Sequence, residues 1–195
     1  MSGHAEQITE ESVIHDAQTK RIGKHMGKLY SKEYTWFKKI PKSMIEKIWG
    51  VNTQACEPDG GSFWFDGLPQ VTVEGKFQGQ DGQAGYALEY EKLSTLSTIN
   101  PNLEHIMFCA GKGCISKSVD GKTKKDMGVF NCFAHNLKVQ FDNRNLLNTY
   151  VYQSPNGFTD KEMMDIIKKH LDAKRGLTEN IVRTSPISLR GVLDV

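Results

Sequence analysis

The sequence predicts an α+β domain in which an antiparallel β-sheet curves around a C-terminal helix. Two observations on the order of its patterns lead to this fold class. Short segments of alternating polarity follow one another between glycine and asparagine turns from Ser62 to Tyr152, at the spacing of antiparallel strands. A helical pattern at about 10–21 precedes them, and a well-capped amphipathic helix at 159–173 follows them.

The first helix is predicted from Thr9, whose side chain suits the N-cap position. We expect this helix to end near residue 21, because Gly23 and Gly27 lower the stability of a helix interior. The basic stretch that follows is interpreted as a loop that leads into the domain. A chain of 195 residues is near the usual size of one domain. The predicted division is therefore an N-terminal tail and helix at 1–30, one α+β domain at 31–176, and a C-terminal tail or edge segment at 177–195.

The stretch EYTWFKKIPKSMIEKIWGV, residues 33–51, changes its pattern at Pro41. Before the proline, aromatic and β-branched residues are dense enough for a first strand. After it, a capping box at Ser43 and Glu46 and a stop at Gly50 predict a short helix. The order is therefore strand, then short amphipathic helix.

The central part of the chain predicts six or seven antiparallel strands. The segments that carry the pattern are 68–77, 85–93, 103–111, 137–141 and 146–153, with a hairpin turn at Asp120–Gly121. The glycine-rich stretch EPDGGSFWFDGLPQ, residues 57–70, predicts a loop rather than a strand. Trp64 in this loop either lies on a mobile lid over a cavity or fills one end of the core.

The C-terminal helix has the clearest pattern in the sequence. Thr159 and Glu162 form a capping box, and Gly176 supplies a C-terminal stop after a helix of about 14 residues. Its apolar stripe consists of Met163, Ile166, Ile167 and Leu171. Such a stripe has to be buried, and we expect it to pack against the inner face of the sheet.

Composition and charge indicate which classes of protein to expect. Lys and Arg number 25 and Asp and Glu number 23, so the net charge of +2 does not predict a nucleic-acid partner. The N-terminus has no signal-peptide pattern, and no apolar run has the length of a membrane span. The four cysteines are too sparse for a disulfide scaffold and are interpreted as reduced thiols, which predicts a cytoplasmic protein. No short motif of a common enzyme class is present.

The order of the predicted elements, with WFKKIPKSMIEKIWGV at 36–51, resembles the helix-grip fold of the START and Bet v 1-like superfamily over residues 33–173. The N-terminal helix and the C-terminal tail depart from that pattern. The resemblance implies a cavity between sheet and helix that holds a sterol, a lipid or a polyketide, and in some members catalyses cyclisation or isomerisation. A calycin-like β-barrel with flanking helices, as in lipocalins and fatty-acid-binding proteins, explains the same strands and is the alternative.

The candidate site residues are side chains that an apolar cavity would use for polar contacts. The predicted ligand-binding residues are Trp64, Tyr86, Tyr90, His135, Tyr150 and Tyr152. The candidates for acid or base catalysis are His105, His135 and Tyr90. A zinc site would need Cys109, Cys114, Cys132 and His135, but buried cysteines are also ordinary small apolar residues, so we assign no metal and no cofactor.

Three functions from different classes follow from the sequence. The first is a carrier or sensor that binds a small hydrophobic or aromatic molecule. The second is a cofactor-independent isomerase, cyclase or lyase that uses the same cavity, and it requires an inward-pointing histidine or tyrosine. The third is a protein–protein interaction module, which requires an exposed apolar patch.

Overall fold

The computed structural model describes residues 9–39, 57–77, 97, 100–111 and 148–184, and the side chains of this set up to residue 177. Its elements are α1 (Glu10–Leu29), β1 (Thr35–Phe37), β2 (Gly61–Phe65), β3 (Leu68–Phe77), β4 (Glu104–Ala110), β5 (Thr149–Ser154) and α6 (Asp160–Thr184). The predicted helix at 43–50, the strands at 85–93 and 137–141 and the hairpin at Asp120–Gly121 lie outside the described residues.

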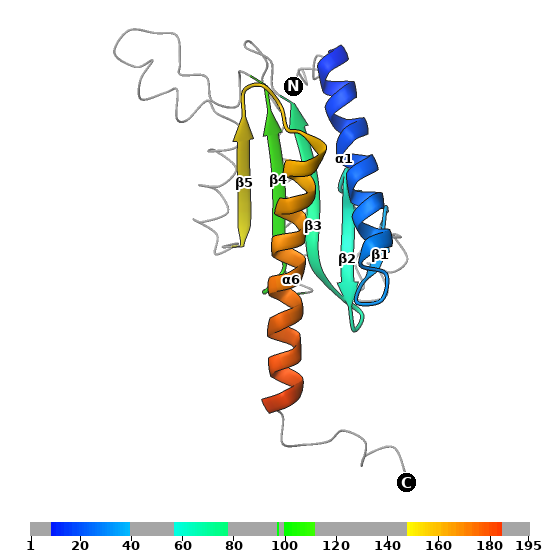
Figure 1. Cartoon of the computed structure of the whole chain (residues 1–195), viewed down its shortest axis with the longest axis vertical. Helices are drawn as coiled ribbons and strands as arrows, with labels where there is room; N and C mark the ends of the chain where they lie inside the picture. The colour runs from blue at the N-terminus through cyan, green and yellow to red at the C-terminus, as the bar shows by residue number, and fades with distance from the viewer. Residues whose placement is uncertain (1–8, 40–56, 78–96, 98–99, 112–147, 185–195) are drawn as a thin grey trace, which may run out of the picture.

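The five strands form one open sheet in the order β1-β2-β3-β4-β5 (Figure 1). Strands β1, β2 and β3 are antiparallel, but β3, β4 and β5 run parallel to one another. The α+β class is confirmed, and the prediction of an all-antiparallel sheet is wrong. A parallel pair needs a connection of about a dozen residues or more, and the segments 78–103 and 111–148 are long enough to provide it.

The glycine-rich stretch predicted as a loop is strand β2 and its hairpin with β3. The turn between the strands is Asp66–Gly67, and both residues have positive φ angles, of 50° and 72°. Two-residue hairpin loops favour this backbone conformation, and Asp-Gly is a preferred sequence for it. Trp64 on β2 is buried, and its indole Nε1 donates a hydrogen bond to the Ser62 hydroxyl at 2.9 Å.

Helix α1 is confirmed at its start but is eight residues longer than predicted, since it ends at Leu29 rather than at 21. Thr9 caps it, and Thr9 and Ser12 exchange side-chain to backbone hydrogen bonds of 3.1 and 3.2 Å. The two glycines that were expected to end the helix lie where it touches the sheet. A Cβ on Gly23 would lie 1.9 Å from the Gly60 carbonyl oxygen, and one on Gly27 would lie 2.5 Å from the Trp36 ring.

Helix α6 begins with the predicted capping box, in which the Thr159 backbone N–H and hydroxyl donate to Glu162 at 2.7 and 2.8 Å. The prediction that it stops at Gly176 is wrong, because the helix continues to Thr184. A glycine within a helix costs only about 1 kcal/mol relative to alanine, which the flanking helical residues can offset.

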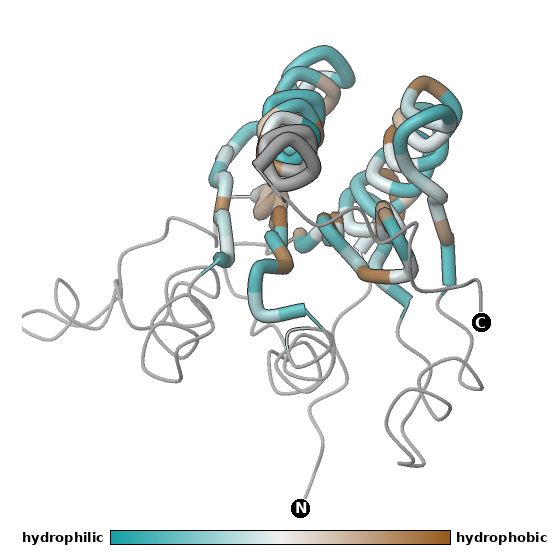
Figure 2. The backbone as a smooth tube through the Cα atoms, turned by 90° about the horizontal axis from the view of Figure 1, so that it is seen from below, coloured by the Kyte–Doolittle hydropathy of each residue, from teal (hydrophilic) through white to brown (hydrophobic). Residues whose placement is uncertain are grey.

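Both helices pack on the same face of the sheet, so the fold has two layers (Figures 1 and 2). The core between the layers joins Ile22 and Met26 of α1 and Met163, Ile167 and Leu171 of α6 to Phe63, Val71, Val73, Ile106 and Phe108 of the sheet. The predicted packing of the C-terminal stripe on the sheet is therefore confirmed. Within the described part of the chain, no helix combines the length and apolar character that crossing a bilayer requires.

Cys109 on β4 is buried and takes part in a disulfide bond. The prediction that all four cysteines are reduced thiols is therefore wrong at this position. Cytoplasmic localisation, which was inferred from reduced cysteines, loses that support and stays a prediction.

Candidate functional site

Strand β3 carries two charged residues, Glu74 and Lys76, in an otherwise largely apolar segment. Glu74 is 2% exposed. Because side chains alternate along a strand, Glu74 and Lys76 lie on the face opposite Val71 and Val73, which contribute to the core under the helices. A buried charged side chain is unusual and costly unless it is paired. The second half of β3 therefore carries two candidate functional residues.

A second acidic residue, Asp59, has its backbone beside Glu74. Asp59 is in the turn that leads into β2, where the Gly61 N–H donates to the Pro58 carbonyl at 2.9 Å. The turn is fixed on β3 by a hydrogen bond of 2.9 Å from the Gly60 N–H to the Val73 carbonyl. The Asp59 backbone N–H donates to Glu74 Oε2 at 2.9 Å, so the backbone of one acidic residue orients the carboxylate of the other.

Glycines in this turn let three segments approach closely. Gly60 packs against Val73, where an added Cβ would lie 2.6 Å from a side-chain methyl carbon. Gly61 has a φ of +80°, which favours glycine. The Gly60 carbonyl accepts a hydrogen bond of 3.1 Å from Trp36 Nε1 and faces Gly23 of α1. The sequence Pro-Asp-Gly-Gly therefore fixes Asp59 between the sheet and α1.

Each carboxylate of the pair has a lysine amine near it. Lys76 Nζ lies 3.4 Å from Glu74 Oε1, and Lys20 Nζ of α1 lies 3.8 Å from Asp59 Oδ1. The lysines partly balance the two negative charges, which lowers the cost of keeping Glu74 ionised where it is buried. Asp59, Glu74, Lys76 and Lys20 are called the acidic site below.

His15 of α1 is a buried neighbour of the acidic site. Burial lowers the pKa of His15 below its usual value of 6.5, against smaller opposing effects of a hydrogen bond with Phe108 and of the Asp59 charge. Its Nε2 lies 3.0 Å from the Phe108 carbonyl oxygen, which can only accept, so Nε2 carries the proton. His15 is therefore neutral near pH 7 and fixed by the sheet.

The acidic site has the composition of a site for a hard divalent cation. Among the described residues, no group of three or more His, Cys, Asp or Glu side chains is placed to hold a metal ion. A closed tetrahedral zinc site needs four such ligands. Mg²⁺ differs from zinc in that it keeps several waters and is bound through one or two carboxylates together with substrate phosphates.

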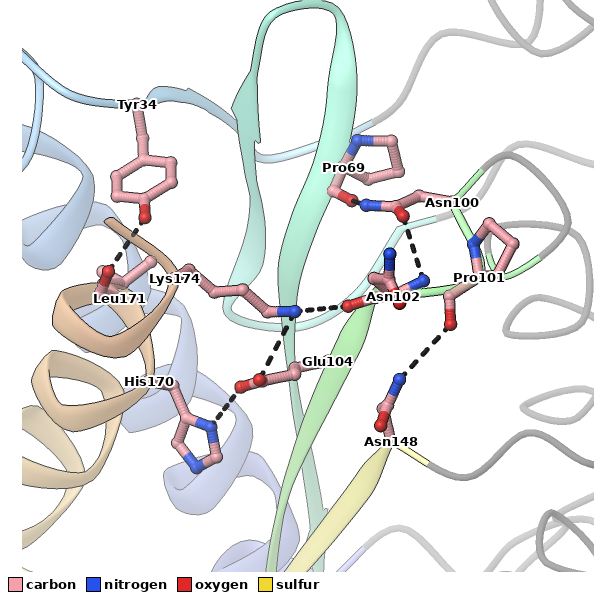
Figure 3. A network of polar contacts seen from close by, with 10 residues as sticks. All are labelled: Tyr34, Pro69, Asn100, Pro101, Asn102, Glu104, Asn148, His170, Leu171 and Lys174. Carbon is pink, nitrogen blue, oxygen red and sulfur yellow. Dashed lines mark hydrogen bonds and ion pairs between the residues drawn. The ribbon is translucent and has the colours of Figure 1, made fainter. Parts of the chain in front are cut away.

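A second cluster of buried charges lies on the helix-facing side of the sheet (Figure 3). His170 Nδ1 of α6 donates to Glu104 Oε2 of β4 at 2.6 Å, and Lys174 Nζ lies 3.4 Å from Glu104 Oε1. Lys174 also donates to the Asn102 carbonyl, and His170 Nε2 lies 2.8 Å from the Tyr152 hydroxyl. We call Glu104, His170 and Lys174 the α6 cluster.

The α6 cluster joins the helix to the strands. Burial alone would raise the pKa of Glu104, but the hydrogen bond from His170 and the charge of Lys174 outweigh it and hold that pKa below its usual value. Nearby, the Tyr34 hydroxyl donates to the Leu171 carbonyl at 2.8 Å, and burial raises the pKa of Tyr34 to about 12. The charged groups of the cluster have partners across the layer boundary, which is the pattern of a structural contact.

The predicted ligand-binding residues that lie within the described part of the chain are on different strands and do not come together. Trp64 lies on β2, whereas Tyr150 and Tyr152 lie on β5, with β3 and β4 between them. His105 is buried on β4, and its Nδ1 is hydrogen-bonded to the Thr72 hydroxyl. Tyr86, Tyr90 and His135 lie outside the described residues, as do Cys114 and Cys132 of the zinc alternative.

Sequence reasoning missed Asp59, Glu74 and Lys76. Strand 68–77 was predicted from the apolar Val71 and Val73, whereas Glu74 and Lys76 lie on its opposite face. The available indication was a Glu and a Lys two residues apart within an apolar strand, preceded in the chain by an Asp in a glycine turn at the start of the neighbouring strand.

Neither a protein-family model, nor a curated protein, nor a solved structure matches the chain. The resemblance to the START and Bet v 1-like superfamily therefore stays a prediction. Function is inferred instead from the geometry of the described residues.

Proposed function

We propose that this chain is a divalent-metal-dependent hydrolase that cleaves phosphodiester bonds in nucleic acid. The observation that carries the proposal is that Asp59, in the turn before β2, donates its backbone N–H to the buried Glu74 of β3, which lies 3.4 Å from Lys76 Nζ. Two carboxylates and an amine are the side chains that a metal-assisted phosphoryl transfer uses. The proposal departs from the sequence-based expectation of no metal and no nucleic acid.

The roles of the residues follow from their contacts. Asp59 and Glu74 would hold Mg²⁺, which stabilises the negative charge that develops on the phosphate oxygens during hydrolysis. The Asp59 N–H holds the Glu74 carboxylate in one orientation, so little reorganisation is needed when the ion binds. Lys76, whose ammonium group lies 3.4 Å from Glu74, would place a further positive charge beside the phosphate.

The position of the acidic site in the fold agrees with this role. Glu74 and Lys76 lie in the second half of β3, whose neighbour β4 runs parallel to it. The ends of β3, β4 and β5 point the same way (Figure 1). In α/β sheets, ligands commonly bind beyond the carboxyl ends of parallel strands, where loops can surround them.

Nucleic acid is the proposed substrate because positive charge is concentrated on the helix beside the site. The net charge of +2 is small, but residues 17–29 of α1 contain Lys20, Arg21, Lys24 and Lys28 and no Asp or Glu. Local clustering of cations along a helix, rather than the total charge, is the electrostatic feature that attracts a phosphate backbone. Lys20 belongs to both the cluster and the acidic site.

The test is cleavage of long genomic DNA and of mixed-sequence RNA, which together present many sequences, with Mg²⁺ and with EDTA. We expect Mg²⁺-dependent cleavage that falls at least about 100-fold in Asp59→Asn and Glu74→Gln, because each removes a charge that holds the ion. Glu104→Gln is the matched control, since it neutralises a partly buried carboxylate outside the acidic site. Equal activity of Glu74→Gln and the wild type, or full activity in EDTA, would overturn the proposal.

The binding of a small hydrophobic molecule, with or without isomerase, cyclase or lyase chemistry, stays a separate prediction, as does an interaction module. A cavity function would use the interface between the sheet and the helices, whereas Glu74 and Lys76 of the acidic site lie on the other face of β3. A fluorescence titration with apolar ligands tests it independently.

A further inference from the structure

We propose that the outer face of α1 binds the sugar–phosphate backbone of the substrate and leads it to the acidic site. The surface consists of Lys20, Lys24 and Lys28, called the lysine stripe below. This inference rests on the proposed function, because it identifies how the substrate of the acidic site is held.

The lysine stripe follows from the spacing of α1. Lys20, Lys24 and Lys28 are separated by four residues each, so they lie on one side of the helix and cover about 12 Å of its length. All three are exposed. The buried side of the same turns consists of Ile22, Gly23, Met26 and Gly27, which face the sheet. The packing of α1 thus fixes the direction of the stripe.

The stripe begins at the acidic site, because Lys20 Nζ lies 3.8 Å from Asp59 Oδ1. Lys24 and Lys28 form no ion pair within the described part of the chain. Helix α6 differs in this respect, since its exposed Lys161 and Lys168 pair with acidic residues four positions later. The pattern of α6 is that of a solvated surface helix, whereas Lys24 and Lys28 have no Asp or Glu three or four positions away on α1.

A row of three cations over about 12 Å suits a phosphate backbone. Each strand of duplex nucleic acid carries one phosphate per about 3.4 Å of helix axis, so the row covers about three or four phosphates. Such contacts fix the position of a substrate without reading its sequence. An anionic lipid surface would also be attracted to positive charge, and binding to such a surface is one outcome of the test.

The experiment measures binding by fluorescence anisotropy of a labelled 20-base-pair DNA in metal-free buffer over a series of salt concentrations. We expect Lys24→Glu/Lys28→Glu to bind at least tenfold more weakly than the wild type. The slope of log affinity against log salt should also become shallower, by about 0.9 for each phosphate that the variant no longer neutralises. Lys161→Glu/Lys169→Glu changes the net charge equally on exposed positions of α6 and is the matched control. Its affinity should stay within about threefold, and thermal melting should show that both variants fold.

If both double variants bind DNA equally weakly, the proposed role of the lysine stripe is wrong, because the total charge would then explain the binding. Unchanged affinity of Lys24→Glu/Lys28→Glu would also overturn it, as would stripe-dependent binding to phosphatidylserine vesicles with no binding to DNA. The proposed function is tested by a different measurement, because it fails if Glu74→Gln cleaves nucleic acid as fast as the wild type. If Lys24→Glu/Lys28→Glu keeps its affinity for DNA while Glu74→Gln loses cleavage, DNA binding by the lysine stripe is refuted and the proposed function of the acidic site is not.

Discussion

Replacing Gly23 by alanine tests whether the contact between α1 and the Asp59 turn positions the acidic site. Gly23 is buried in the interior of α1, and a Cβ at this position would lie 1.9 Å from the Gly60 carbonyl oxygen and 2.5 Å from its carbon. Real Cβ atoms do not approach backbone atoms so closely. Either the helix or the turn that carries Asp59 must therefore move.

The expected size of the effect combines two opposing terms. Alanine in place of glycine stabilises a helix interior by about 1 kcal/mol. Overpacking a close contact costs about 1–3 kcal/mol, and the obstructing group here is backbone, which cannot rotate away as a side chain can. The clash should outweigh the helix gain, so we expect Gly23→Ala to lower the free energy of unfolding by up to about 2 kcal/mol.

The measurement is urea unfolding followed by circular dichroism, with the midpoint compared at unchanged slope. Gly176→Ala is the matched control, because Gly176 also lies within a helix and an added Cβ there meets no atom within 4 Å. It should be stabilised by about 0.5–1 kcal/mol. If Gly23→Ala is stabilised as much as Gly176→Ala, the close contact between α1 and the turn is wrong. Cleavage by Gly23→Ala should fall further than the decrease in folded protein explains, since the turn carries Asp59.

Three further predictions concern the core, the α6 cluster and the apolar-ligand alternative. Leu171→Ala should cost about 2–5 kcal/mol of unfolding free energy because Leu171 is fully buried, whereas Leu177→Ala, at an exposed position, should change it by less than about 0.5 kcal/mol in the same urea experiment. The folded state favours the ionised form of Glu104, because it lowers the pKa of this carboxyl below the usual value of 4.5. The stability that ionised Glu104 contributes is therefore fully present above pH 4.5 and is lost as the pH falls through the lower folded pKa. The stability difference between wild type and Glu104→Gln, measured by thermal melting from pH 7 to pH 3, should shrink below about pH 4.5. If the chain binds an apolar ligand, titration with fatty acids or sterols should change tryptophan fluorescence saturably, by an amount that Trp64→Phe reduces; a flat titration would contradict that function.

Local patterns were sufficient to predict several elements. The capping residues Thr9 and Thr159 marked helix starts because an N-cap needs only residues three positions away. Strands β3 and β4 were predicted from their own composition. Their parallel pairing was not predictable, because it depends on which strands become neighbours after connections outside the described residues. The turn at Asp66–Gly67 did carry a local hairpin pattern, which the high glycine content around it obscured.

The glycines of α1 show how tertiary packing overrides propensity. Gly23 and Gly27 predicted the end of a helix, since glycine weakens a helix interior. The folded chain uses them because only glycine allows α1 to approach Gly60 and Trp36 so closely. The acidic site was hidden for a related reason. Asp59 and Glu74 are 15 positions apart, and the antiparallel register of β2 and β3 brings them together.

The two buried charge clusters differ in what they do for the fold. The α6 cluster joins a helix to a strand and to the Asn102 carbonyl, so its ion pairs contribute to the attachment of α6. Glu74 and Lys76, in contrast, are two residues apart on one strand, and Glu74 also accepts a hydrogen bond from the Asp59 N–H, which attaches the turn before β2 to β3. Burying an ion pair costs desolvation energy that its attraction often fails to recover, and apolar residues of similar size are frequently as stable or more stable. The proposed function gives Glu74 and Lys76 a role that does not depend on stability, namely the binding of Mg²⁺ and phosphate beside Asp59.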